Sequence, residues 1–329
     1  MTTTSPAHPT WTVAAADEAP LESIRFHGLQ AGPKLLVLGA VHGNETCGPD
    51  AIARIVEDCR SGRLLIRRGE VTFVPVTNPK AYRQNTREGD RNLNRDMYER
   101  PQPIDNEDRI GRRLCALLRE HEVLLDVHSF KGEGEPFVFF GPEDNTGPLE
   151  PFRHGAAELA LAACLGVPVA IHGWLDNYLQ LIAARERLDL PRLAVTEGFG
   201  TTEFMRFAGG YGVTLECGRH GDPASVEIGY IAIRNTLAHL GLIDAPAPVP
   251  ALEAIIKMTE AVICETAGDV AEAVWKTGNR VPEGAVLATR ADGRTVTAPC
   301  DGFVIFPSTT AKPGEPICHF GVKSPRRPA

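Results

Sequence analysis

The chain has 329 residues, of which 34 are basic and 42 acidic, so its formal net charge at pH 7 is −8. This acidic balance, with only 6% aromatic residues and no long basic run, excludes the electrostatic footprint of a nucleic-acid binder. A chain of this length can bury a large core, which excludes a single small module and favours one large domain with a smaller one.

Eight cysteines are scattered along the chain without a C-x-x-C pair, which indicates reduced thiols in a cytosol rather than a disulfide framework. The N-terminus lacks the basic and apolar regions of a signal peptide, and no stretch approaches the length of a membrane span. We therefore expect a soluble cytoplasmic protein with no membrane or nucleic-acid partner. The sequence leaves a homo-oligomer open.

In chain order, residues 1–32 are rich in Thr, Ala and Pro and are expected to form a loose lead-in with a short strand or two. From Leu35 onward, short apolar runs alternate with amphipathic stretches. The predicted strands are Leu35–Val41, Val71–Thr77, Val123–His128, Phe137–Phe140, Val167–His172, Leu193–Glu197 and Val213–Cys217. The predicted helices are Gly48–Cys59, Glu107–His121, Leu149–Leu165 and Val226–Leu242. This alternation predicts an α/β domain over residues 33–244, with a mixed, mostly parallel sheet flanked by helices.

A proline-rich segment, residues 243–251, follows this domain and is typical of a linker. Beyond it the apolar runs are short and bounded by turns, which predicts a small β-rich domain over residues 245–329. Its pattern resembles the barrel-sandwich fold of biotinyl and lipoyl carriers. The modifiable lysine of such carriers is not evident, because Ala291–Arg294 occupies the expected turn.

The first chemical motif lies where the run Leu35–Val41 ends on His42, with Glu45 three residues later. It is the only His-x-x-Glu spacing among the ten histidines, although such a pair also arises by chance. Gly43 permits a sharp exit from the strand, which places the pair at the carboxyl edge of a sheet, where open α/β sheets bind ligands. The pair is therefore interpreted as half of a metal site.

A second strand ends on Asp126-Val-His128. Catalytic zinc commonly takes three protein ligands, so His42, Glu45 and His128 would complete a His₂Glu set. Asp126 could orient a ligand from outside this set. The structural alternatives are a core histidine bonded to backbone for His128 and a cap for Asp126.

The polar segment 78–95 holds four arginines, the last of which is Arg95. Another predicted strand ends on Glu216. Arginine forks match carboxylates and stabilise developing oxyanions, so such a loop beside a metal indicates an anionic substrate, whereas alone it would be a solvated surface loop. Glu216 could act as general base and acid beside a metal. Glu197 competes for that role, and the pattern barely separates the two.

Together these residues resemble the aspartoacylase and succinylglutamate desuccinylase family of zinc deacylases, which are related to zinc carboxypeptidases. Gly39–Glu45 is similar to the family's G-x-x-H-G-N-E, Asn92–Arg95 resembles its D-L-N-R, Asp126–His128 matches its D-x-H, and Glu216 matches its catalytic glutamate. The resemblance covers most of residues 35–242 and implies that residues 33–244 form a zinc hydrolase catalytic domain.

By position, the resemblance implies that His42, Glu45 and His128 hold one zinc ion per chain and that Glu216 activates water. It also implies that Arg87 polarises the scissile carbonyl. The expected reaction is hydrolysis of the amide of a small anionic N-acyl amino acid. A carboxypeptidase acting on a short peptide and a non-catalytic metal-binding module are the alternatives.

The resemblance further implies that Asn94 and Arg95 grip the substrate's α-carboxylate and that Arg206 reads a side-chain carboxylate. Asn92 departs from the family, which usually has Asp there, and we expect this to weaken a charge partner of the nearby arginines. The C-terminal domain contains no tyrosine, although aspartoacylase contributes one to its substrate mouth, so specificity for N-acetylaspartate is not expected.

Overall fold

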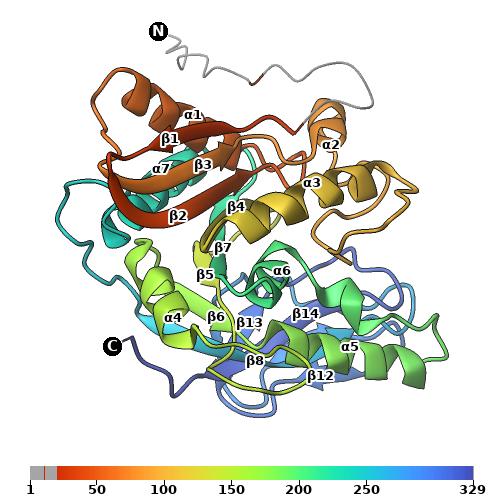
Figure 1. The fold of residues 1–329 in the computed structure, drawn as a ribbon. Helices are drawn as coiled ribbons and strands as arrows, with labels where there is room; N and C mark the ends of the chain where they lie inside the picture. The colour runs from red at the N-terminus through yellow and green to blue at the C-terminus, as the bar shows by residue number, and fades with distance from the viewer. Residues whose placement is uncertain (1–10, 12–20, 329) are drawn as a thin grey trace, which may run out of the picture.

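A computed structural model describes residue 11 and residues 21–328 (Figure 1). Most of the expected lead-in, residues 1–10 and 12–20, lies outside the described residues. The helices are α1 (Cys47–Arg60), α2 (Pro79–Gln84), α3 (Asn106–Glu120), α4 (Gly155–Cys164), α5 (Trp174–Arg187), α6 (Thr201–Phe207) and α7 (Pro223–His239), with a 3-10 turn η1 at Val195–Gly198. The strands are β1 (Ile24–His27), β2 (Gln30–Gly39), β3 (Arg68–Val74), β4 (Val123–Phe130), β5 (Phe137–Phe139), β6 (Val169–His172), β7 (Tyr211–Arg219), β8 (Ala254–Ile263), β9 (Val270–Ala271), β10 (Arg280–Val281), β11 (Val286–Thr289), β12 (Thr295–Thr297), β13 (Gly302–Ile305) and β14 (Pro316–Lys323).

One large mixed sheet organises the chain, in the order β1-β3-β2-β4-β7-β5-β6-β8-β14-β13-β10. Strands β3, β2, β4 and β7 are parallel neighbours, whereas β5 runs antiparallel to β7. The carboxyl ends of β2, β4 and β7 therefore meet at one edge of the sheet, which is where side chains from distant segments can converge.

Helices cover both faces of this sheet, as the layers in Figure 1 show. Successive residues of a strand point to opposite faces. In β2, Leu35 and Val37 pack with α1 and α7 in one apolar cluster, while Leu36 and Leu38 pack with α3 and α6 in another. Burial on both faces explains why β2 ends in a continuous apolar run rather than an alternating one.

The predicted fold class is confirmed, and most predicted elements are found within a few residues of their expected bounds. The predicted strand Leu193–Glu197 is wrong, because η1 occupies that place and the Glu197 carboxylate accepts from the Ala194 amide. The predicted helix Leu149–Leu165 begins only at Gly155. Helices α2, α5 and α6 were not predicted.

The C-terminal residues form the expected short strands, including a separate small antiparallel sheet in the order β12-β11-β9. Strand β8, however, pairs in parallel with β6, and β14 pairs with β8, so the large sheet continues into this part of the chain. The boundary at residues 244 and 245 stays a prediction. Within the described residues, no helix is both long and apolar enough to cross a membrane.

Candidate metal centre and active site

The His-Gly-Asn-Glu segment leaves β2 through a tight passage beside α2. Ala40 takes a left-handed backbone conformation with φ of 45°. A Cβ placed on Gly43 would lie 2.0 Å from the carbonyl carbon of Ala81, so only glycine fits against the α2 backbone. This close approach turns His42 and Glu45 back over the carboxyl edge of the sheet.

Three buried side chains meet there. The Glu45 carboxylate lies between the two histidines, with Oε1 2.9 Å from His42 Nδ1 and Oε2 2.8 Å from His128 Nδ1. One ligand atom from each of these three residues lies within 4.8 Å of the others, a spacing that one ion can bridge. The structure thus brings together the three residues that the sequence predicted as metal ligands.

The outer nitrogen of each histidine faces an oxygen acceptor. His42 Nε2 is 3.0 Å from Asn92 Oδ1, and His128 Nε2 is 3.0 Å from Asp126 Oδ2. Such partners place the proton on Nε2 and turn the Nδ1 lone pair inward, as around protein-bound zinc. His42 Nδ1 and His128 Nδ1 are both buried and both face the Glu45 carboxylate, so the donor set fits a metal ion.

Burial and mutual charge shift the titration of these groups strongly. Burial lowers the pKa of His42 to about 4. Burial alone would raise the pKa of Glu45, but the two histidines hold it well below its ordinary value. Burial would lower the pKa of His128, but the Asp126 and Glu45 carboxylates raise it well above its usual range. The Glu45 carboxylate therefore stays charged between the two histidine rings.

Glu216 joins the group from the neighbouring strand, since it stands opposite His128 in the β4 and β7 register. Its Oε2 is buried without a hydrogen-bond partner. Burial, with the nearby charge of Glu45, raises the pKa of Glu216 to about 8. A carboxyl group with a pKa close to neutral can both take and return a proton. Its competitor Glu197 instead lies on η1, bonded to the Ala194 amide.

Arg87 approaches the same carboxylate from the polar loop. Its Nη1 lies 3.0 Å from Glu45 Oε1, and nearly half of its side chain is exposed. The guanidinium can therefore reach a ligand above the three buried residues. Its contact with Glu45 was not expected from the sequence, because it arises only when the loop folds over the sheet edge.

Asn94 and Arg95, together called the carboxylate clamp below, lie further along the same loop. Asn94 Oδ1 accepts from the amide of Thr201, at the start of α6. The Arg95 guanidinium lies 4.8 Å from the ring centre of Trp174 and donates to the Asn94 carbonyl. Among the described residues no carboxylate pairs with Arg95, so its charge is available to an anion.

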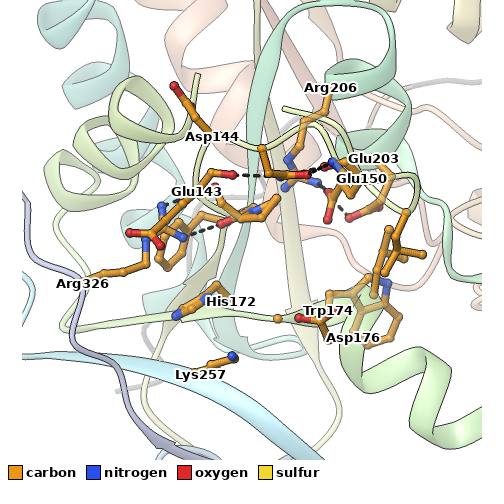
Figure 2. A pocket seen from close by; sticks show the side chains of 18 of the residues that line it. Glu143, Asp144, Glu150, His172, Trp174, Asp176, Glu203, Arg206, Lys257 and Arg326 are labelled. Carbon is orange, nitrogen blue, oxygen red and sulfur yellow. Dashed lines mark hydrogen bonds and ion pairs between the residues drawn. The ribbon is translucent and has the colours of Figure 1, made fainter. Parts of the chain in front are cut away.

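Arg206 lies in a different, buried ion cluster on α6. Its guanidinium contacts Glu150 at 2.6 Å, Glu203 at 3.0 Å and Glu158 at 3.1 Å. Figure 2 shows Glu150 and Glu203 turned toward it at the wall of a cavity of about 400 Å³. Three carboxylates thus already engage the arginine that the sequence placed with the substrate.

Asn92 contacts a histidine rather than the arginines that we expected it to serve. Its Oδ1 accepts from both His42 Nε2 and the Asn94 amide. Two further contacts were missed: Thr201 Oγ1 donates to Asp126, and Ser129 Oγ lies 2.8 Å from His220 Nδ1. Thr201 follows the Gly-Phe-Gly segment without any motif of its own, so the sequence offered no signal for it.

Comparison with known proteins agrees with this picture. Residues 31–135, which hold the three metal-ligand candidates, match the family model of the succinylglutamate desuccinylase/aspartoacylase catalytic domain. The resemblance that the motifs indicated is therefore confirmed for this segment. No curated protein matches the chain.

Several solved structures share the fold over almost the whole chain. A succinylglutamate desuccinylase/aspartoacylase from Rhodobacter sphaeroides is 18% identical, covers 92% of this chain and 89% of its own, and has a TM-score of 0.70. The ectoine utilization protein EutE (DoeB) from Ruegeria pomeroyi is 23% identical, with coverages of 94% and 92% and a TM-score of 0.69. An aspartoacylase family protein from Mesorhizobium loti is 21% identical, with the same coverages and a TM-score of 0.68.

Proposed function

We propose that the protein is a zinc-dependent amidohydrolase that removes the acyl group from a small anionic N-acyl amino acid. The observation that carries this proposal is the convergence of His42, Glu45 and His128 with Glu216 at one sheet edge. The family match over residues 31–135 and the family names of the structural neighbours support the reaction class.

In this proposal His42, Glu45 and His128 hold the zinc ion. Zinc in such a site acts as a Lewis acid and brings the pKa of a bound water toward roughly 7. Glu216 takes a proton from the attacking water and delivers it to the leaving amine, for which a buried carboxyl group with a pKa of about 8 is suited.

The substrate is oriented by the carboxylate clamp. Arg95 has no partner carboxylate among the described residues and is fixed against Trp174, so it can take the α-carboxylate without first breaking an ion pair. Arg87, half exposed beside Glu45, would stabilise negative charge that develops on the scissile carbonyl oxygen. Arg206 is not part of this proposal, because three glutamates already engage its guanidinium.

A panel of N-acyl amino acids and short peptides, offered to the zinc-loaded protein, tests the proposal. We expect amide cleavage of N-acyl amino acids and a loss of turnover of at least about 10²-fold in E216Q, which keeps the shape of Glu216 but cannot take a proton. Cleavage of peptides alone would favour the carboxypeptidase alternative. Zinc binding without cleavage of any amide would favour the binding module.

A further inference from the structure

Thr201, the first residue of α6, is a fully buried threonine wedged between the clamp loop and the metal centre. The residue before it must be small, since a Cβ on Gly200 would lie 2.2 Å from Asn94 Oδ1. The absence of a side chain at Gly200 leaves room for the Asn94 side chain to reach the first turn of α6. The local backbone is thus built around contacts that Thr201 makes on two sides.

On one side, Thr201 contacts the residue behind a metal ligand. Its Oγ1 donates to Asp126 Oδ2 at 2.5 Å, and the same oxygen lies 3.0 Å from His128 Nε2. Asp126 is fully buried, and its other oxygen, Oδ1, has no hydrogen-bond partner. A buried carboxylate held at so few points depends on each of them for its orientation.

On the other side, Thr201 contacts the carboxylate clamp. Its amide donates to Asn94 Oδ1 at 2.9 Å, and the Asn94 amide donates to Asn92 Oδ1 at 2.9 Å. Asn92 Oδ1 in turn lies 3.0 Å from His42 Nε2. Contacts therefore run in a continuous chain from His42, through Asn92, Asn94, Thr201 and Asp126, to His128.

We propose that Thr201 is a positioning residue, which fixes Asp126 behind His128 through its hydroxyl and ties the carboxylate clamp to the metal centre through its amide. The inference rests on the proposed metal site. It assigns to Thr201 no contact with substrate or metal. The contact with Asp126 uses the Thr201 hydroxyl, whereas the contact with Asn94 uses the Thr201 backbone amide. A side-chain substitution can therefore remove the contact with Asp126 and leave the contact with Asn94.

Thr201→Val, Thr201→Ser and Thr202→Val separate this role from general packing. Valine keeps the shape and the backbone amide but removes the hydroxyl, whereas serine keeps the hydroxyl. Thr202 is a matched control, because it is also buried in the first turn of α6 but its hydroxyl contacts Glu203. The measurement is the zinc dissociation constant, obtained by competition with a chromogenic chelator. Thr201→Ala adds no bulk and replaces the valine variant if that variant does not fold.

Partners behind a metal-ligating histidine typically change metal affinity 10- to 100-fold, and Thr201 acts one contact further out. We expect T201V to weaken zinc binding by about tenfold, with T201S close to the wild type and T202V unchanged. At saturating zinc, kcat of T201V falls while KM changes by less than about twofold, because the amide still holds Asn94.

Equal zinc affinities of folded T201V and wild type would overturn the proposal, as would an equal loss in T202V. If the wild type binds zinc but cleaves no amide, the proposed function fails, yet the zinc affinities of the three variants still decide the role of Thr201. If the wild type binds no zinc, both fail.

Discussion

The unlike partners of the two metal-ligand histidines lead to a prediction about metal affinity. His128 faces the Asp126 carboxylate, whereas His42 faces only the amide oxygen of Asn92. A carboxylate acceptor makes a hydrogen bond roughly twice as strong as a neutral acceptor and raises the basicity of the ligand behind it. Substituting Asn92 by Asp should therefore tighten metal binding at His42.

The magnitude follows from the contact itself. Net hydrogen bonds are worth about 1 kcal/mol when neutral and about 1.5 to 3 kcal/mol when charged. The gain for N92D is therefore on the order of 1 kcal/mol, or a fewfold to tenfold in the zinc dissociation constant. An aspartate keeps an oxygen in the place of Oδ1, so the bond from the Asn94 amide is retained.

The assay is zinc competition against a chromogenic chelator at fixed pH and ionic strength. D126N is the matched control, since it makes the opposite exchange behind His128 and should weaken zinc binding. An N92D protein that folds like the wild type but binds zinc no more tightly, while D126N loses affinity, would refute the reasoning for His42. Equal affinities in all three proteins would show that the partners of the two histidines do not tune zinc affinity.

Three other predictions concern the clamp, the ion cluster and the C-terminal packing. R95K should raise KM for an N-acyl amino acid about tenfold or more, with a smaller change in kcat, because lysine cannot form a bidentate pair with a carboxylate. An unchanged KM would show that Arg95 does not bind the substrate carboxylate. Burial raises the pKa of Glu150 to about 7, so the stability that its protonation contributes is complete below about pH 4.5 and is lost as the pH rises through 7. Between pH 5 and pH 8, the free energy of unfolding measured in urea should therefore fall more for the wild type than for E150Q. Equal falls in the two proteins would contradict this. The centroid of the Phe306 ring lies 5.5 Å from that of Phe137 and 6.1 Å from that of Phe130. F306A should therefore lower the free energy of unfolding by roughly 2 to 3 kcal/mol, and the control F306L should lower it by less. An F306A protein as stable as the wild type would contradict this packing.

The metal-ligand candidates could be predicted from the sequence because their signals are local. His42 and Glu45 stand three residues apart at the end of an apolar run, and His128 closes another such run. Parallel strands bring their carboxyl ends to one edge whatever the details of the loops. Short-range pattern and topology together were therefore enough to bring these three residues together.

The contacts behind these residues depend on loops and could not be predicted in the same way. Asn92 reaches His42 across fifty positions, and Thr201 reaches Asp126 across seventy-five, with no spacing rule linking either pair. Arg206 was assigned to the substrate by position alone, but Glu150, Glu158 and Glu203 lie around it. Which carboxylates surround a buried arginine depends on which segments pack together, and the sequence pattern did not show this for Arg206.

The central claim is that His42, Glu45 and His128 hold the zinc ion that drives amide hydrolysis. The most direct test measures the zinc-to-protein ratio and hydrolysis of an N-acyl amino acid on the same samples of wild type and H42A. We predict one zinc per chain in the wild type, activity that is lost with a chelator and restored by zinc, and loss of both zinc and activity in folded H42A. A folded H42A protein that retains full zinc, or a zinc-stripped wild type that still cleaves the amide at its full rate, would contradict the claim.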